Sequence, residues 1–247
     1  MGASAPLYPV GLVVEGRPCL VVGGGRVAAR KIAGLLACGA AVTVVAPEVH
    51  EAVSALAEAG TIAAIGDVPL RVELRPYRPD DVRGAALVLA ATGDPAVDAA
   101  VHRDATAAGV WVNVADDAGH CSFVLPAVGR DGTVTVTIST GGASPALATW
   151  LRDRVQAELS GAGVLAGLLS QGRARLQDQG RATADADWRA LLEGPLPDLV
   201  RAGHVDEARA VVDAFVDAAL ARPAAPRSPR TDAPAPGGAP TPEQPPA

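Results

Sequence analysis

The sequence predicts an α/β protein in which a parallel β-sheet is followed by a short β segment and then by helices. Two observations predict the sheet: short apolar runs alternate with helical patterns over 8–112, and a glycine cluster joins the first run to the first helix. A third observation, the helical spacing of apolar residues over 144–220, predicts the helical part. A chain of 247 residues can hold one or two domains with their own cores.

The elements of the sheet region are expected in strand–helix order. Strands are predicted at 18–23, 41–46, 71–75, 86–91 and 109–114, and helices at 26–37, 48–59 and 95–107. Pro47 ends the second strand, because proline cannot donate to a ladder. Asp94 and Pro95 suit the N-cap and the first position of the third helix.

A change of character over 121–140 predicts the β segment. Ser122–Leu125 and Thr133–Ile138 are expected to be strands, separated by a turn at Arg130-Asp131-Gly132. Threonines alternate with apolar residues in the second strand, which predicts one exposed and one packed face.

Helices are expected over 144–220, with breaks near 161–163 and 194–195, where glycine and proline gather. Beyond Arg222 the chain is mainly proline, alanine and glycine. Such a segment buries too little apolar surface to offset its ordering entropy, so a disordered tail is expected over 223–247.

Composition excludes several classes of function. A net charge of −6 argues against broad nucleic-acid binding and against adhesion to a membrane surface. No apolar run reaches the length of a membrane span and no leader precedes the first strand, so a cytoplasmic protein is expected. The three cysteines, Cys19, Cys38 and Cys121, have no paired spacing, and we expect neither disulfides nor a metal site.

The most informative motif is the glycine turn Leu-Val-Val-Gly-Gly-Gly-Arg-Val-Ala-Ala-Arg-Lys at 20–31. Gly23 suits a tight turn, Gly25 allows backbone to approach a pyrophosphate, and Ala28 allows close packing of helix on strand. The helix N-terminus offers free N–H groups to the phosphates. The predicted cofactor-binding residues are Gly23, Gly24, Gly25, Arg26, Val27, Ala28, Ala91 and Thr92.

The contact with the cofactor ribose stays unassigned. A Rossmann-type site usually places an acid at the end of the second strand, whereas this chain has Ala46 and Pro47 there, with Glu48 the nearest acid. No arginine stands there to meet a 2′-phosphate. The residues alone therefore leave NAD and NADP open.

Two further strings carry candidate chemistry. Asn113-Val-Ala-Asp116 ends the fifth strand, where Asp116 could act as a general base; the alternative is a plain turn of solvated acids, Asp117 included. Ser139–Ala148 contains Gly141 and Gly142, whose N–H groups could bind a carboxylate, and Ser144, which also suits a helix N-cap. His120 suits proton transfer or Fe²⁺, with a turn histidine of no such role as the alternative.

Together with Ala90-Ala-Thr-Gly-Asp-Pro95, these motifs resemble the siroheme-synthase family, most closely its precorrin-2 dehydrogenase module, which is sometimes also a sirohydrochlorin ferrochelatase. The likeness covers about 8–160 well and the helical part to about 220 loosely. It implies a Rossmann-type parallel sheet, then a small β dimerisation region and a helical domain. The implied parts are an NAD-binding domain at 1–113, a dimerisation and substrate region at 114–150, a helical domain at 151–222 and the tail at 223–247.

The resemblance implies NAD-dependent oxidation of precorrin-2 to sirohydrochlorin in siroheme biosynthesis, by a homodimer. It makes Asp116 the catalytic residue and NAD the cofactor. Because precorrin-2 is a polycarboxylate, we expect the loop with Gly141, Gly142 and Ser144 to bind this substrate. Insertion of Fe²⁺ is a separate question, because members with and without that activity share these motifs. The alternative is an NAD(H)-sensing regulatory module without catalysis.

Overall fold

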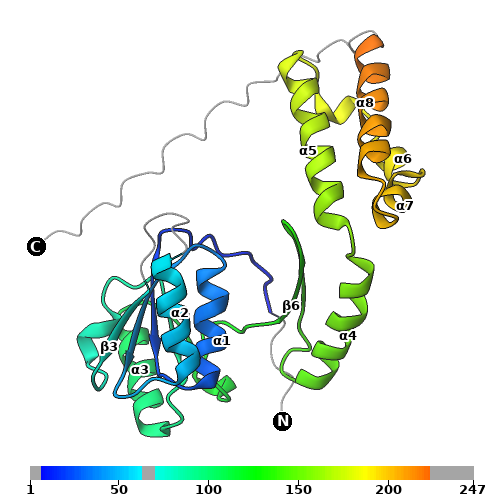
Figure 1. Ribbon diagram of the computed structural model, residues 1–247. Helices are drawn as coiled ribbons and strands as arrows, with labels where there is room; N and C mark the ends of the chain where they lie inside the picture. Colours follow the sequence, from blue (N-terminus) through cyan, green and yellow to red (C-terminus); the bar gives the residue numbers. More distant parts are fainter. Residues whose placement is uncertain (1–6, 63–69, 223–247) are drawn as a thin grey trace, which may run out of the picture. The chain divides into compact units, whose positions relative to one another are not determined.

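The computed structural model describes residues 7–62 and 70–222, which form two compact units (Figure 1). The first unit takes in the chain up to Val128 together with Thr137–Arg154. The second takes in Gly129–Val136 and the described residues from Val155 to Arg222. The tail expected at 223–247 lies outside the described residues.

The first unit contains a five-stranded parallel sheet, as predicted, and its strand order is β3-β2-β1-β4-β5. Its strands are β1 (Pro18–Val22), β2 (Ala41–Ala46), β3 (Arg71–Leu74), β4 (Leu87–Ala90) and β5 (Trp111–Val114). The order reverses between β1 and β4, and ligands of such sheets bind at this switch point, at the carboxyl ends of the strands.

Helices cover both faces of the sheet (Figure 1). On one face, α1 (Arg26–Leu36) and α2 (Glu51–Ile62) pack on one set of alternate strand residues, Val21 and Val44 among them. On the other, α3 (Pro95–Ala107) and the short η1 (Pro79–Val82) pack on the alternate set, which includes Val22. The faces divide by the two-residue period of a strand, and both are apolar, as a parallel sheet requires.

Helix α2 begins later than the predicted residue 48. The backbone N–H of His50 donates to the Gly24 carbonyl at 2.8 Å, and its Nδ1 accepts from the Ala52 N–H at 3.1 Å. His50 therefore ties the start of α2 to the glycine turn, and residues 48–50 form the connection rather than a first helical turn.

The predicted strand at Ser122–Leu125 is wrong. The hairpin consists of β6 (Ala127–Asp131) and β7 (Val134–Ile138), joined through Gly132, which has φ of 55°. Ser122 instead binds the end strand β5: its N–H donates to the Val112 carbonyl at 2.8 Å, and its Oγ accepts from the Val112 N–H at 2.7 Å. The apolar run therefore covers a sheet edge. In β7 the threonines are exposed and the apolar residues half-buried, as predicted.

Residues 145–221 are mainly helical, as predicted. The helices are α4 (Pro145–Glu158), α5 (Ala162–Asp178), α6 (Trp188–Leu192), α7 (Leu196–Arg201) and α8 (Val205–Ala221), with the short η3 (Thr183–Asp185) before α6. Within the second unit, α5 and α8 approach closely at Gly172, where a Cβ would lie 3.1 Å from Val212 Cγ1 and 3.2 Å from Val216 Cγ2. Leu168, Leu176 and Leu196 complete this core.

Candidate active site

The glycine turn connects the end of β1 to α1, and its three glycines have different surroundings. Gly23 has φ of 119°, and a Cβ there would lie 2.2 Å from the Ala91 carbonyl oxygen at the end of β4. A Cβ on Gly24 would lie 2.1 Å from the Glu48 carbonyl oxygen. A Cβ on Gly25 would meet no described atom within 4 Å. Two glycines thus allow backbone to pack on backbone, and the third leaves open space.

The N-terminus of α1 opens into this space. Gly25 is the N-cap, no described side chain caps the helix, and its first turn holds no acid. Ala28 is completely buried against the sheet. The unpaired N–H groups and the positive end of the helix dipole form an arrangement that suits a phosphate.

Arg26 and Val27, which were also predicted to bind the cofactor, are the first two residues of α1. Arg26 is exposed, and its Nε lies 3.0 Å from His50 Nε2, so that it faces the start of α2. Val27 is 37% exposed beside it. Both side chains therefore stand outside the core, next to the open end of the helix.

Thr92 lies directly after β4, and Asp98 of α3 holds it in place. Asp98 Oδ1 accepts from the Thr92 hydroxyl at 2.8 Å and from the Thr92 N–H at 3.3 Å, and Asp98 is 8% exposed. Asp94 caps α3, accepting from the Ala96 N–H at 2.9 Å, as predicted. No role for Asp98 is predicted from the sequence alone, because an acid in the first turn of a helix is common.

Asp116 follows β5 at the same carboxyl edge. It has φ of 60°, the only positive φ among the described non-glycine residues. Aspartate tolerates this left-handed conformation better than most residues, although it remains an uncommon one. Asp116 is exposed, and it makes no hydrogen bond or ion pair with the part of the chain that is described. Its carboxylate is therefore available to a ligand.

The neighbouring Asp117 is already engaged. Its Oδ2 lies 2.6 Å from His120 Nδ1, and its Oδ1 accepts from the Gly119 N–H at 3.1 Å, capping the short η2 (Ala118–His120). The hydrogen bond from His120 holds the pKa of Asp117 below its usual range. The ring of His102 on α3 lies edge-on to His120 at 4.7 Å. The carboxylate of Asp116 can thus meet a ligand, whereas that of Asp117 is held by His120 and Gly119.

A polar network underlies the Asp116 loop. Lys31 Nζ on α1 donates to Asn113 Oδ1 at 2.9 Å, although the two residues are 82 positions apart. Asn113 Nδ2 donates to the Phe123 carbonyl at 3.0 Å, and Cys121 Sγ accepts from the Val114 N–H at 3.2 Å. Burial lowers the pKa of Lys31, and the charges of Cys121 and Asp116 act in the opposite direction.

The predicted substrate loop precedes α4. Gly141 and Gly142 have φ of 62° and 83°, and a Cβ on either would meet no described atom within 4 Å. Ser144 Oγ accepts from the Leu147 N–H at 3.1 Å, so Ser144 caps the helix. Thr140 braces the loop, because its Oγ1 accepts from the Ser144 N–H at 3.1 Å.

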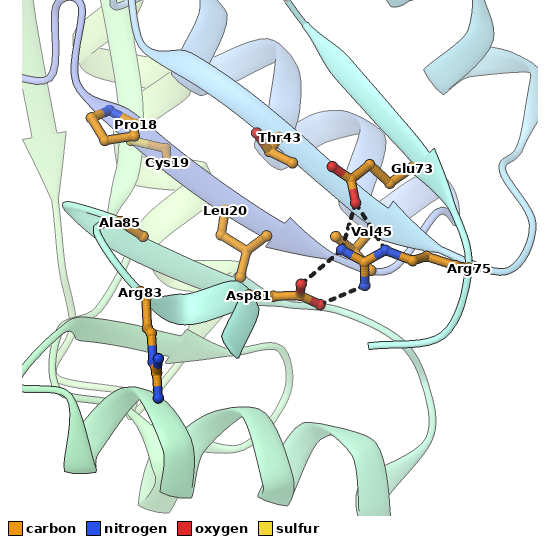
Figure 2. A pocket seen from close by; sticks show the side chains of 10 residues that line it. All are labelled: Pro18, Cys19, Leu20, Thr43, Val45, Glu73, Arg75, Asp81, Arg83 and Ala85. Atoms are coloured by element: carbon orange, nitrogen blue, oxygen red, sulfur yellow. Dashed lines mark hydrogen bonds and ion pairs between the residues drawn. The ribbon is translucent and has the colours of Figure 1, made fainter. Parts of the chain in front are cut away.

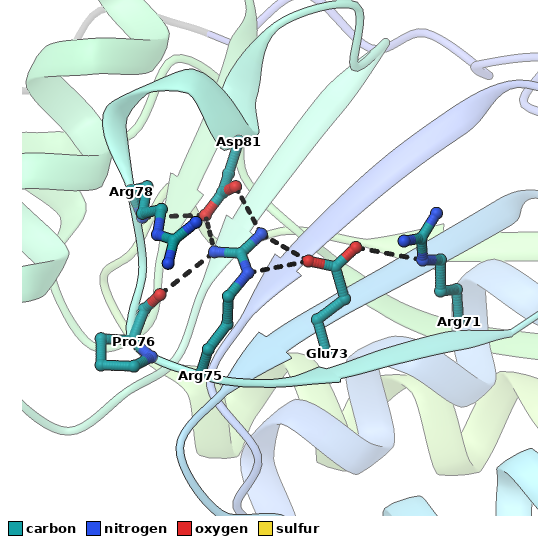
Figure 3. Close-up of polar contacts among 6 residues, drawn as sticks. All are labelled: Arg71, Glu73, Arg75, Pro76, Arg78 and Asp81. Carbon is teal, nitrogen blue, oxygen red and sulfur yellow. Dashed lines mark hydrogen bonds and ion pairs between the residues drawn. The ribbon is translucent and has the colours of Figure 1, made fainter.

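A hollow of about 160 Å³ lies elsewhere, on the sheet face opposite α1 and α2 (Figure 2). Arg75 lies within it and donates to both Glu73 and Asp81, while Glu73 also pairs with Arg71 (Figure 3). These bonds raise the pKa of Arg75. The hollow contains none of the predicted site residues, and the two cations that line it, Arg75 and Arg83, are already paired with acids.

Within residues 7–62 and 70–222, no three histidine, cysteine or acidic side chains gather as metal ligands. No described helix is both long and apolar enough to cross a membrane.

Comparisons with known proteins show which families and structures this chain is similar to. Residues 10–127 match a family model described as putative NAD(P)-binding, and 131–158 match one described as sirohaem biosynthesis protein central. The siroheme synthase of Nitrosococcus oceani is 36% identical over 212 residues, which are 85% of this chain and 44% of that protein. The siroheme synthase of Methylococcus capsulatus is 39% identical over 215 residues, with the same shares.

The chain belongs to the siroheme-synthase N-terminal family. It spans less than half the length of these curated relatives. A solved structure named SirC, precorrin-2 dehydrogenase, is similar over 85% of this chain and 100% of its own, with a TM-score of 0.65 and 27% identity. The predicted family and fold class are therefore confirmed. The match to the NAD(P)-binding model also confirms an NAD-type dinucleotide as the cofactor of this siroheme-synthase family member.

Proposed function

We propose that this chain catalyses the NAD⁺-dependent oxidation of precorrin-2 to sirohydrochlorin, a step of siroheme biosynthesis. The observation that carries the proposal is the available carboxylate of Asp116, at the sheet edge onto which the glycine turn also opens. The likeness to a precorrin-2 dehydrogenase along that protein's whole length supports it.

The open end of α1 is the proposed cofactor site. The residues proposed to hold the dinucleotide are Gly23, Gly24, Gly25, Arg26, Val27, Ala28, Ala91 and Thr92. An exposed acid, Glu48, follows β2, and an acid there suits the ribose diol of NAD⁺ better than a 2′-phosphate. When bound, NAD⁺ supplies the acceptor for the hydride that leaves the substrate.

Asp116 is the proposed general base. The oxidation removes a hydride equivalent and a proton from precorrin-2, and a carboxylate without a protein partner can take that proton. Precorrin-2 is a polycarboxylate. Gly142 lies in open space just before α4, with Gly141 and Ser144 beside it, and we place one of the substrate's carboxylates at these three residues.

Insertion of Fe²⁺ is a second proposed activity, with the ion as a substrate. Insertion of Fe²⁺ into sirohydrochlorin displaces two pyrrole N–H protons. Asp116 is proposed to take them one after the other and to release each to solvent, because a carboxylate binds one proton at a time.

We also propose a cytoplasmic homodimer. Leu147 and Trp150 lie on one side of α4 and are 46% and 54% exposed, which leaves an apolar face suited to a second copy. Sedimentation velocity tests the dimer, and Trp150→Glu should shift the protein toward monomer.

The cytoplasmic location is proposed from the cysteines. All three lack the spacing of a disulfide framework, which favours a reducing compartment.

The deciding experiment supplies enzymatically made precorrin-2 and NAD⁺ under anaerobic conditions and follows absorbance at 340 nm. Substrate-dependent NADH formation is expected, and Fe²⁺ added afterwards tests for insertion above the uncatalysed rate. Folded protein that binds NAD⁺ without forming NADH would favour the sensing module instead.

Two neighbouring acids provide a matched pair of variants for this assay. Asp116→Asn should lower turnover by roughly 10²-fold or more, which is the scale of general-base catalysis, with NAD⁺ binding unchanged. Asp117→Asn removes the charge that faces His120 and should leave turnover within about two-fold of the parent, since that carboxylate is committed to the protein. Equal losses in both variants would remove the distinction between the acids.

A further inference from the structure

His50 connects the glycine turn to the start of α2. Its backbone N–H donates to the Gly24 carbonyl at 2.8 Å, which holds the residue beside the turn. Its ring Nδ1 accepts from the Ala52 N–H at 3.1 Å, and its carbonyl accepts from the Val53 N–H at 2.8 Å. His50 therefore caps α2 with its side chain, in the position that serine or asparagine usually takes.

This cap decides which ring nitrogen of His50 carries the proton. A nitrogen that accepts a hydrogen bond has no hydrogen of its own, so the contact with Ala52 leaves Nδ1 bare. The single proton of the neutral ring then lies on Nε2, and this assignment follows from the hydrogen bond at Nδ1. The far nitrogen of His50 is therefore a donor.

The side chains of Arg26 and His50 present two donors to each other. Arg26 Nε lies 3.0 Å from His50 Nε2, and a guanidinium offers donors only. Two N–H groups cannot satisfy each other, because each needs a lone pair to accept its hydrogen. Among the residues that the structure describes, no other polar group meets either donor. An acceptor placed between them would receive a hydrogen bond from both.

The two donors lie at the open end of α1. Arg26 is the first residue of that helix and directly follows Gly25, where a Cβ would meet no described atom within 4 Å. A phosphate oxygen suits this place, because a guanidinium binds phosphate through short, charge-assisted hydrogen bonds.

We propose that His50 and Arg26 together hold a phosphate of the bound dinucleotide, with His50 donating from Nε2 while its Nδ1 caps α2. That the ligand is a dinucleotide rests on the proposed function. The phosphate is either the pyrophosphate, which NAD⁺ and NADP⁺ share, or the 2′-phosphate, which NADP⁺ alone carries. The affinities for both dinucleotides, measured by calorimetry, distinguish these sources.

Two amide variants of His50 separate the roles of its ring nitrogens. Asparagine is a strong helix cap but is too short to reach the place of Nε2. His50→Asn should therefore keep the thermal midpoint of the parent and bind at least one of the two dinucleotides about ten-fold more weakly. Glutamine reaches the place of Nε2 with an amide N–H but is not among the good caps. His50→Gln should therefore unfold at a lower temperature and keep both affinities within about three-fold.

Arg26→Gln tests the second donor. It removes the charge and should weaken binding of the same dinucleotide by about ten-fold or more. Arg30→Gln is the matched control, because it removes an equal charge from an exposed side chain one turn further along α1. Its affinities should stay within about two-fold of the parent. Combining Arg26→Gln with His50→Asn should cost less than the product of the two single losses, since both side chains hold one phosphate.

The pattern across the two dinucleotides identifies the phosphate. Equal losses for NAD⁺ and NADP⁺ indicate the pyrophosphate, and a loss confined to NADP⁺ indicates the 2′-phosphate. Parent-like affinities of His50→Asn for both dinucleotides overturn the proposal, because water then satisfies the donors.

A measurement on the parent protein needs no variant. The ¹⁵N chemical shifts of the imidazole show which nitrogen carries the proton, and His50→Gln assigns the resonances. We expect the proton of His50 on Nε2. A proton on Nδ1 instead overturns the proposal, even if His50→Asn fails to fold.

The outcomes also separate this inference from the proposed function. If the parent binds a dinucleotide but forms no NADH with precorrin-2, the dehydrogenase proposal is wrong, and the affinities still decide the role of His50. If the parent forms NADH and His50→Asn binds as the parent does, only the inference about His50 is wrong. A parent that binds neither dinucleotide overturns both.

Discussion

Asp98 Oδ1 accepts two hydrogen bonds from Thr92, one from the hydroxyl at 2.8 Å and one from the backbone N–H at 3.3 Å. This carboxylate on α3 sets the conformation of the chain just beyond β4, next to the proposed cofactor. Because Asp98 is buried, Thr92 keeps this geometry in the absence of any ligand.

Asp98→Ala should therefore affect both stability and cofactor binding. Two donors lose their acceptor, which costs about 1–3 kcal/mol of unfolding free energy. NAD⁺ affinity, measured by calorimetry, should fall about ten-fold, because Thr92 is no longer held. Asp94→Ala is the control: it removes a helix cap worth about 1 kcal/mol and should leave the NAD⁺ affinity unchanged. Equal affinities in the two variants would contradict the role given to Asp98.

Substitution by alanine should destabilise the protein strongly at Gly23 and hardly at all at Gly25. Gly23→Ala places a Cβ 2.2 Å from the Ala91 oxygen at φ of 119°, and we expect a loss of roughly 2–5 kcal/mol in unfolding free energy. Gly25→Ala meets open space at φ of −80° and should change stability by less than about 0.5 kcal/mol.

The NAD⁺ affinity of the stable Gly25→Ala variant then tests whether Gly25 lies in the cofactor site. Gly25→Ala should weaken NAD⁺ binding at least ten-fold, because the added methyl group takes the space proposed for the pyrophosphate. Parent-like affinity in this stable variant would show that the dinucleotide does not approach Gly25. Urea unfolding and calorimetry on the same samples provide both readouts.

The parallel sheet could be predicted because its strands are buried on both faces and appear as short apolar runs between helical patterns. The run at Ser122–Leu125 has the same appearance, yet it is bonded along β5 through Ser122 and packs Phe123 against the core. An apolar run in the sequence indicates that the segment is buried. It does not distinguish a strand of the sheet from a segment that covers the edge of one.

The glycine turn and Asp116 could be singled out because they fall at strand ends, where ligands of such sheets gather. The supporting contacts could not be predicted. Lys31 and Asn113 are 82 residues apart, and their hydrogen bond leaves no periodic pattern. Asp98 looks like an ordinary acid in the first turn of a helix, and only its burial under Thr92 reveals its role.

Ser144 combines a helix cap with the proposed substrate loop, and two substitutions separate these roles. Ser144→Asn and Ser144→Asp both preserve capping, whereas Ser144→Ala should lose about 1 kcal/mol of stability. Ser144→Asp adds a negative charge beside Gly142 and should raise KM for the polycarboxylate substrate several-fold, while Ser144→Asn should not. If the two variants share one KM, no substrate carboxylate binds at this helix start.

The Arg75–Asp81 pair predicts how stability depends on pH. Burial would raise the pKa of Asp81, but hydrogen bonds from Arg75 and Arg78 outweigh it and hold that pKa below its ordinary value of about 3.9. Since the folded state holds this proton less tightly than the unfolded state, the stabilisation from the ionised Asp81 is present at neutral pH and is lost as the pH falls through the lowered pKa.

Arg75→Met should therefore lower the urea midpoint at pH 7, and its urea midpoint should approach that of the parent near pH 2.5. Arg71→Met, which removes an exposed partner of Glu73 only, should have the smaller effect. A difference between Arg75→Met and the parent that is as large at pH 2.5 as at pH 7 would show that Arg75 acts through packing rather than through the ionised Asp81.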